Sequence, residues 1–294
     1  MPSTLLTEDP GLNAGPGTLY VVATPIGNRD DITLRALSVL KNADLIAAED
    51  TRHTGKLLSL HNIKGRLISY HEYNERVKTP DLIDRLKNGS SVALVSNAGT
   101  PVVSDPGYRL ISEAIKAGIK IVPVPGVSAA VAALSVSGLA TDSFIFIGFC
   151  PKKKEKRLDL LKDLKKEKRT IIFYESPRRI LRFIEEIISV TGERHSVLSR
   201  EITKIHEEFI RGTLSEILTV LKERSEIKGE CTLIVSGCKE KEASSPETVT
   251  KEIKENICSN KKPLSVLAKE TAKKFGLSRK AVYEEALRIK NEQS

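Results

Sequence analysis

The chain has 294 residues, of which 40% are hydrophobic, and this is typical of a folded protein with two or more domains. Its 47 Lys and Arg residues exceed its 38 Asp and Glu residues, which gives a formal net charge of +9. This surplus favours nucleic acid as a partner, although a lysine-rich surface without a partner explains it equally well. No apolar run reaches about 18 residues and no signal-peptide pattern opens the chain, so no membrane association is predicted.

The cysteines and histidines do not form a pattern that predicts a metal site. Cys150, Cys231, Cys238 and Cys258 lack the paired spacing of zinc ligands, and the five histidines form no HxxxH set. Scattered thiols are typical of a reducing compartment. The sequence therefore predicts a cytoplasmic protein without a metal.

Short apolar runs alternate with amphipathic stretches between residues 18 and 138. Strands are predicted at 19–23, 44–48, 66–69, 92–95 and 119–124, and helices at 33–41, 52–61, 79–87, 109–117 and 128–135. Thr79 is the expected N-cap of the third helix, with Pro80 in its first turn. Apolar strands separated by helices predict an α/β domain with a parallel sheet.

The pattern changes after residue 138. Strands are predicted at 144–149, 170–174, 195–200, 206–211 and 230–236, with helices at 178–188 and 214–224, and this order indicates a mixed sheet. Beyond residue 248, helical stretches flank a turn at 275–278, as in a helix-turn-helix. The predicted organisation is a flexible tail at 1–17, α/β domains at 18–138 and 139–237, a linker at 238–248 and a helical domain at 249–294.

Four loops follow predicted strands, three of them rich in Gly, Pro and short polar residues and one with two acids and an arginine. They read Ala-Thr-Pro-Ile-Gly-Asn at 23–28, Glu-Asp-Thr-Arg at 49–52, Ser-Asn-Ala-Gly-Thr-Pro-Val-Val-Ser-Asp-Pro-Gly at 96–107 and Pro-Gly-Val-Ser-Ala at 125–129. Each loop alone is equally well explained as an ordinary turn. Because open α/β sheets bind ligands at the carboxyl ends of their strands, the four together predict one ligand pocket.

Titratable side chains after two of these strands are the candidates for proton transfer. Glu49 and Asp50 follow the second predicted strand, and His71 follows the third. The competing interpretation is structural, because acids at a helix N-terminus favour the macrodipole and His71 lies in a polar turn. The sequence leaves both interpretations open.

Five motifs, taken in order, resemble the tetrapyrrole-methylase-like superfamily. They are the four loops above and Tyr-Glu-Ser-Pro at 174–177, and the resemblance extends over residues 18–237. Within the superfamily they resemble the enzymes that transfer a methyl group from S-adenosylmethionine to the ribose 2′-oxygen of a cytidine in the decoding centre of 16S rRNA. The stretch at 264–290 is similar to that family's small C-terminal helical domain. One departure is Asn97, where the family usually has Asp.

The resemblance implies a two-domain tetrapyrrole-methylase-like fold with a cofactor cleft, a homodimer, and the small ribosomal subunit as partner. It also implies a set of S-adenosylmethionine contacts. They are Pro25, Gly27, Asn28, Ala98, Gly99, Thr100, Asp105, Ser128, Ala129, Tyr174 and Leu233.

Basic side chains near the predicted cleft are expected to contact rRNA phosphates, together with the C-terminal helices. They are Arg52, Lys152, Lys153, Lys154, Lys156, Arg157, Arg178 and Arg179. Two other functions stay open. One is methyl transfer to a corrin or porphyrin precursor, and the other is rRNA binding without catalysis. Cofactor binding separates this last function from the two enzymatic ones.

Overall fold

The computed structural model describes residues 17–238, 246–258, 263–275 and 277–292. The predicted tail, apart from Gly17, and residues 239–245 of the predicted linker lie outside the described residues. The chain forms two compact units, which divide between Gly237 and Cys238. The first unit holds both predicted α/β segments, so the boundary expected near residue 138 stays a prediction.

The first sheet of this unit is parallel throughout, as the sequence predicts. Its strand order is β3-β2-β4-β1-β5, which places β4 between two strands that precede it in the chain. All four residues of β2 and of β4 are buried because helices cover both faces of the sheet. The strands are β1 (Thr18–Val22), β2 (Leu45–Ala48), β3 (Leu67–Ser69), β4 (Val92–Val95) and β5 (Lys120–Val124).

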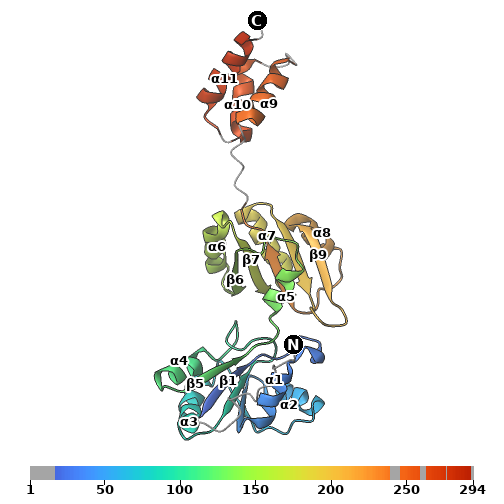
Figure 1. Ribbon diagram of the computed structural model, residues 1–294. Coiled ribbons are helices and arrows are strands. Elements are labelled where there is room, and N and C mark those ends of the chain that lie inside the picture. Colours follow the sequence, from blue (N-terminus) through green and yellow to red (C-terminus); the bar gives the residue numbers. More distant parts are fainter. Residues whose placement is uncertain (1–16, 239–245, 259–262, 276, 293–294) are drawn as a thin grey trace, which may run out of the picture. The chain divides into compact units, whose positions relative to one another are not determined.

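The helices divide between the two faces of this sheet (Figure 1). On one face lie α1 (Leu34–Asn42) and α2 (Thr51–Leu60), and on the other α3 (Glu75–Lys87) and α4 (Tyr108–Lys116). A short 3₁₀ turn, η1 (Arg29–Asp31), precedes α1. Because the neighbouring strands β1 and β4 lead to helices on opposite faces, a crevice opens between the loops that follow them.

The start of α3 differs from the sequence prediction. The helix begins at Glu75 rather than at Thr79, and Asn74 occupies the N-cap. The Asn74 amide closes the turn after β3, since it donates to the Ser69 carbonyl and accepts the His71 N–H. Thr79 does not cap the helix, because its hydroxyl donates to the carbonyl of Glu75 one turn earlier. Thr79 and Pro80 have the residue types of a helix start, although the helix begins four residues earlier.

The second sheet is mixed, as predicted. Its order is β6-β7-β10-β8-β9, in which β6 and β7 are parallel and the other neighbours are antiparallel. The strands are β6 (Phe144–Phe149), β7 (Thr170–Glu175), β8 (His195–Arg200), β9 (Glu208–Thr213) and β10 (Cys231–Val235). The late strand β10 enters the centre of this sheet, so residues 230–232 lie beside the end of β7.

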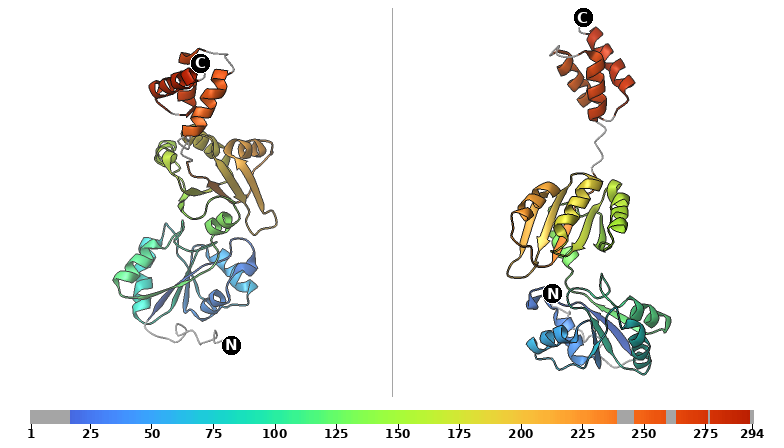
Figure 2. Two further views of the ribbon diagram at one scale, coloured as in Figure 1. Left: turned by 45° about the horizontal axis from the view of Figure 1, so that its top comes forward. Right: turned by 180° about the vertical axis from the view of Figure 1, so that it is seen from behind.

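Helices cover both faces of the second sheet as well (Figure 2). The larger core forms under α6 (Lys154–Asp163), α7 (Ile180–Thr191) and α8 (Leu214–Lys222), and η2 (Leu164–Lys166) follows α6. The short helix α5 (Ala129–Ser135) packs on the opposite face, against Ile172 and Ile234. Although α5 follows the first sheet in the chain, its apolar side contacts the second.

The second unit is a bundle of three helices. They are α9 (Pro246–Cys258), α10 (Leu264–Phe275) and α11 (Arg279–Glu292). Its core contains Leu267 and Ala268 from α10 and Val282 and Ala286 from α11, and each pair recurs on one face of its helix. None of the described helices combines the length and the apolar character needed to cross a bilayer.

Arg157 is a structural residue rather than a surface contact for RNA, so this part of the sequence prediction is wrong. Its guanidinium forms two hydrogen bonds to Glu186, of 2.6 and 2.9 Å, and both side chains are more than nine-tenths buried. It also donates to the carbonyls of Pro151 and Lys152. The arginine therefore fixes the turn after β6 to α7, and it holds the pKa of Glu186 below its usual range.

We expect Arg157→Ala to lower the free energy of unfolding of the first unit by about 3–5 kcal/mol, because Glu186 loses its main partner in a buried site. Arg182→Ala is the matched control: Arg182 bonds the same carboxylate but is 63% exposed, so its loss costs less than about 1 kcal/mol. Urea unfolding followed by tyrosine fluorescence measures both, since five of the six tyrosines precede Gly237. Equal losses would contradict this assignment.

Candidate active site

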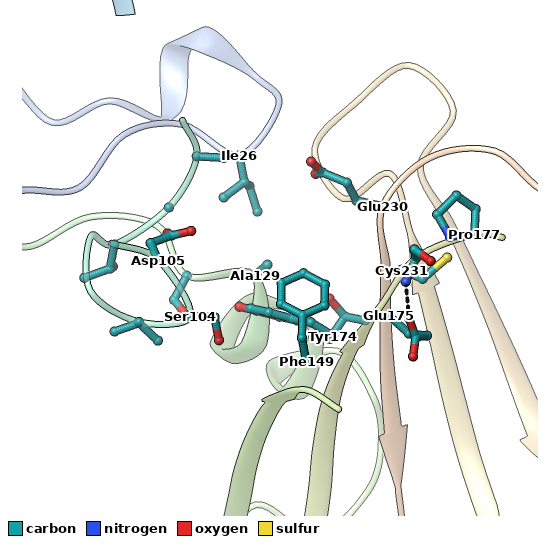
Figure 3. Close-up of a pocket in the computed structure, with 17 residues that line it drawn as sticks. Ile26, Ser104, Asp105, Ala129, Phe149, Tyr174, Glu175, Pro177, Glu230 and Cys231 are labelled. Carbon is teal, nitrogen blue, oxygen red and sulfur yellow. Dashed lines mark hydrogen bonds between the residues drawn. The ribbon is translucent and has the colours of Figure 1, made fainter. Parts of the chain in front are cut away.

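A cavity of about 310 Å³ lies at the carboxyl ends of the first sheet's strands (Figure 3). It is enclosed between the loops that follow those strands and the ends of three strands of the second sheet. The β4–α4 loop and the start of α5 line it from one direction, and the ends of β6 and β7 and the start of β10 from the other. It lies at the crevice that the strand order creates. This is the default position for a ligand in such a fold.

Two hydrogen bonds join the loops after β1 and β4 at the cavity. The N–H of Thr24 donates to the carbonyl of Gly99, and the N–H of Gly99 donates back to Thr24, both at 2.9 Å. Gly99 has a φ of +75°, which favours glycine. The Thr24 hydroxyl also donates to the carbonyl of Ser96. The bridge orients Ile26 over the cavity, where it contacts the Gly99 position.

The β4–α4 loop is strained where it lines the cavity. Val102 and Ser104 have φ values of +75° and +66°, which are unfavourable for residues with a side chain and most of all for a β-branched one. Gly107 ends the loop with a φ of +132°, and a Cβ there would approach Leu94 and Val102 at 2.8 Å. The surrounding packing thus holds the loop in one shape that directs Asp105 into the cavity (Figure 3).

Asp105 has an unusual electrostatic environment. Burial raises the pKa of its carboxyl to about 6, and the negative charges of Glu49 and Glu230 contribute in the same direction. A hydrogen bond with Ser96 opposes the shift. A carboxyl with a pKa near neutrality in a cavity is typical of a functional site.

Aromatic rings form the opposite wall. Tyr174 at the end of β7 contacts Phe146 and Phe149, with ring centroids 5.0 and 5.6 Å apart. Its hydroxyl accepts the backbone N–H of Ala130 at 3.1 Å, which ties α5 to the second sheet. Burial raises the pKa of this hydroxyl, so it stays protonated at neutral pH. The wall therefore offers a flat apolar surface that suits a planar ring.

The loop after β1 contacts the second sheet as well as the first. A Cβ on Gly27 would lie 2.7 Å from the Thr203 hydroxyl and 3.0 Å from the carbonyl of Ile202. The N–H of Asn28 donates to the same Thr203 hydroxyl at 2.9 Å. Only glycine permits this close approach, which joins the β1 loop to the β8–β9 loop.

The described residues contain no group of three or more His, Cys, Asp or Glu side chains placed to hold a metal ion.

Three comparisons with known proteins agree on the family. Residues 18–218 match the model of the tetrapyrrole (corrin/porphyrin) methylases. The ribosomal RNA small subunit methyltransferase I of Halalkalibacterium halodurans is 52% identical over 76% of this chain and 78% of its own length. The protein of that name from Escherichia coli O157:H7 is 45% identical over 92% of this chain and 95% of its own. The solved uroporphyrin-III-C-methyltransferase from Thermus thermophilus has 25% identity and a TM-score of 0.55, over 75% of this chain and 94% of that one.

The chain belongs to this methyltransferase family. The match to the family model extends over residues 18–218, which contain all five motifs. The family predicted from those motifs is therefore confirmed. The two-sheet fold predicted with it is confirmed too.

The structure brings most of the predicted cofactor-contacting residues of this family member to the cavity. Seven line it: Ala98, Gly99, Thr100, Asp105, Ser128, Ala129 and Tyr174. Pro25, Gly27 and Asn28 do not line it, since their loop contributes Ile26 instead. That these seven residues contact the cofactor stays a prediction.

Leu233 does not line the cavity, and its predicted cofactor contact stays a prediction. Its side chain is fully buried in the core beneath α6, α7 and α8 and does not reach the cavity. The cavity is lined instead by Glu230, Cys231 and Thr232, at the start of the same strand. Neighbouring residues of a strand point to opposite faces and the cavity lies at the strand's end, so the position along β10 decides which residues line it.

The three catalytic candidates from the sequence do not line the cavity. Asp50 caps α2 and pairs with Arg52, which lowers the pKa of its carboxyl to about 2, so the structural interpretation holds for it. Glu49 accepts the backbone N–H of Asn97 at 3.0 Å. His71 follows β3, which β2 separates from β4, and its Nε2 lies 3.3 Å from the amide nitrogen of Asn74.

The predicted RNA contacts other than Arg157 differ in their exposure. Arg52 has an 88% exposed side chain although it pairs with Asp50. Arg179 is half-buried and bonded to Glu175, whereas Arg178 is exposed. Lys152, Lys153, Lys154 and Lys156 are all exposed.

Sequence reasoning missed two acidic residues of the cavity and one aromatic. Glu175 belongs to the Tyr-Glu-Ser-Pro motif, so the sequence carried a signal for it. Glu230 and Phe149 carried none, because they reach the cavity only through the order of strands in the second sheet.

We expect Gly27→Ala to destabilise the first unit by about 1–3 kcal/mol, since the added Cβ overlaps Thr203 and the Ile202 carbonyl. Gly55→Ala serves as the control. Gly55 lies inside α2 with its nearest neighbour 3.6 Å from an added Cβ, so alanine leaves stability unchanged or raises it by up to about 1 kcal/mol. Urea midpoints of the two variants test the close approach, and an unaffected Gly27→Ala would refute it.

Proposed function

We propose that this chain is an S-adenosylmethionine-dependent methyltransferase of the small-subunit rRNA, acting on the ribose 2′-oxygen of a cytidine in the decoding centre of 16S rRNA. The observation that carries the proposal is the likeness to the Escherichia coli protein, which extends over 92% of this chain at 45% identity. A match of that extent includes more than half of the C-terminal unit. The five motifs support the finer choice of cytidine and ribose oxygen by resemblance alone.

The residues at the cavity fit the proposed cofactor. Its volume of about 310 Å³ lies at the lower end of the range of about 300–1,000 Å³ for small-molecule sites. The wall of Tyr174 and Phe149 suits an adenine ring, and the polar backbone near Cys231 offers groups for its edge. The carboxylate of Asp105 favours the positive charge of a sulfonium. The bound cofactor supplies an activated methyl group.

The chain's own contribution to the reaction is placement and proton removal. A ribose hydroxyl is a weak nucleophile until its proton leaves, and methyl transfer requires the oxygen to lie in line with the carbon–sulfur bond. Holding the reactants in this geometry contributes about 7–11 kcal/mol. The bridge between Thr24 and Gly99 and the strained Val102 make the cavity rigid enough for such placement.

A tetrapyrrole methyltransferase is the second candidate. The likeness to the Thermus thermophilus enzyme favours it, but that likeness extends over only 75% of this chain. The exposed lysines after β6 and the C-terminal helical unit favour an RNA substrate instead.

The test is a tritium-transfer assay with the full chain on assembled small subunits, naked 16S rRNA and a corrinoid precursor. We expect transfer to RNA and none to the corrinoid. Ala129→Phe fills the cavity, so we expect it to lose transfer and to weaken S-adenosylhomocysteine binding by about 100-fold. Val131→Phe, at an exposed position of the same helix, leaves both unchanged. Transfer to the corrinoid alone, or binding to neither cofactor form, would reject the proposal.

The lysines after β6 are the proposed contact for rRNA phosphates. We expect Lys152→Glu with Lys156→Glu to weaken binding of a 16S rRNA fragment and to reduce the slope of log affinity against log salt by about 2. The control reverses Lys165 and Lys166, which lie in η2 at the other end of α6. Filter binding across salt concentrations compares them. An equal effect of the two pairs would show that no local RNA contact exists.

We also propose a homodimer, which rests on the resemblance, and a cytoplasmic location, which rests on the scattered cysteines. Sedimentation equilibrium of the full chain tests the first, and cell fractionation tests the second.

A further inference from the structure

A large aromatic side chain stays exposed at the rim of the cavity. Phe149, at the end of β6, lines the cavity and is 57% exposed. The neighbouring ring of Tyr174 is half-buried, and its hydroxyl is bonded to the N–H of Ala130 (Figure 3). Tyr174 is thus enclosed by the protein, whereas Phe149 keeps more than half of its surface available to a molecule outside the cavity.

A β-bulge turns Phe149 to this side of the second sheet. The register of β6 against β7 shifts between Phe146 and Gly148, so β6 carries one extra residue. Because successive side chains of a strand point to opposite faces, this shift moves Phe149 to the face of Tyr174. Without it, Phe149 would point to the larger core beneath α6 and α7. Bulges next to active sites re-aim side chains in this way.

The β4–α4 loop fixes the bulge in place. Gly148 has a φ of +69°, and a Cβ there would lie 2.5 Å from the hydroxyl oxygen of Ser104. Only glycine permits this backbone conformation and this close approach together. Phe149 therefore has a rigid support, and a rigid aromatic ring loses little conformational entropy when it binds a partner.

The chain continues from Phe149 into a turn with four exposed lysines. The buried guanidinium of Arg157 donates to the carbonyls of Pro151 and Lys152, which holds this turn in one shape. Proteins bind single-stranded nucleic acid with this combination, since the ring stacks on a base and the cations contact the backbone. The β6 rim is defined here as Phe149 with Lys152, Lys153, Lys154 and Lys156.

The opposite side of the cavity is acidic. Glu230, before β10, is 74% exposed and shares Lys204 with Glu201, so these three side chains keep a net negative charge. Phosphates are repelled there and attracted to the lysines of the β6 rim. The charges around the cavity therefore favour a nucleic acid backbone along the β6 rim.

We propose that Phe149 stacks on an unpaired base of the RNA substrate while the lysines of the β6 rim hold its phosphates. The inference deepens the proposed function and rests on it. The stack would bring the ribose of the bound nucleotide to the mouth of the cavity. Because bases inside a helix are already stacked on both faces, the site takes a single-stranded segment or a loop rather than a continuous duplex.

The kinetic test compares Phe149→Ala with Phe144→Ala on the RNA that the wild type methylates. Phe144 begins the same strand and is 41% exposed, but it does not line the cavity. We expect Phe149→Ala to raise the KM for RNA about 10- to 100-fold, and to change kcat and the affinity for S-adenosylhomocysteine by less than about threefold. Phe149→Tyr keeps a ring and should retain most of the affinity for RNA. Phe144→Ala should match the wild type.

Salt dependence separates the ring from the lysines. Phenylalanine carries no charge, so Phe149→Ala should leave the slope of log affinity against log salt unchanged. Reversal of Lys152 and Lys156 reduces this slope by about 2. If Phe149→Ala reduced the slope as much as the lysine pair does, the loss would come from a disturbed turn and the stack would be refuted.

A fluorescent reporter detects the stack directly. The chain contains no tryptophan, so the Phe149→Trp and Phe144→Trp variants each carry a single indole. Stacking on a base quenches indole emission, so the methylated RNA should quench Phe149→Trp and leave Phe144→Trp unchanged. A fully paired duplex should quench neither variant. Undiminished emission of Phe149→Trp at saturating RNA would overturn the proposal.

The outcomes separate this inference from the function on which it rests. A wild-type enzyme that methylates RNA, beside a Phe149→Ala variant with an unchanged KM, rejects the stack and leaves the function standing. Weaker S-adenosylhomocysteine binding by that variant also rejects it, since the ring would then belong to the cofactor. A wild-type chain that neither binds S-adenosylhomocysteine nor methylates RNA rejects the proposed function itself.

Discussion

The pair of hydrogen bonds between Thr24 and Gly99 is the contact on which the candidate active site depends. It forms because β4 lies beside β1 in the first sheet, while the helices that follow these strands cover opposite faces. The two loops must part to reach their helices, and the bridge fixes how far apart they lie. The cavity, the position of Ile26 and the course of the β4–α4 loop all follow from this constraint.

Different parts of the first unit stabilise the fold and form the candidate active site. The strained residues Val102 and Ser104 and the half-buried charge of Asp105 all cost free energy at the cavity. Favourable packing lies elsewhere, in the aliphatic cores of the two sheets and in the buried pair of Arg157 and Glu186. The cavity is held in its shape by neighbours that are more stable than it is.

Particular residues show how far the sequence could reveal the site. Ala98, Gly99 and Ser128 were predicted because their loops directly follow apolar strands. The order of residues along the chain was sufficient to place them at the cavity. Arg157 was misjudged because sequence shows residue type and spacing but not the face toward which a side chain points. Glu49 and Asp50 follow their strand as predicted, yet neither lines the cavity, because Glu49 accepts the N–H of Asn97 and Asp50 pairs with Arg52.

The sequence by itself determined the alternation of strands and helices, the family and the set of loops at one edge of a parallel sheet. These features depend on local periodicity, turn residues and motif order, which are written along the chain. Only the tertiary structure decided which carboxylates line the cavity. Burial, ion pairing and pKa depend on neighbours distant in the chain, such as Glu49 and Glu230 around Asp105, and no spacing in the sequence records them.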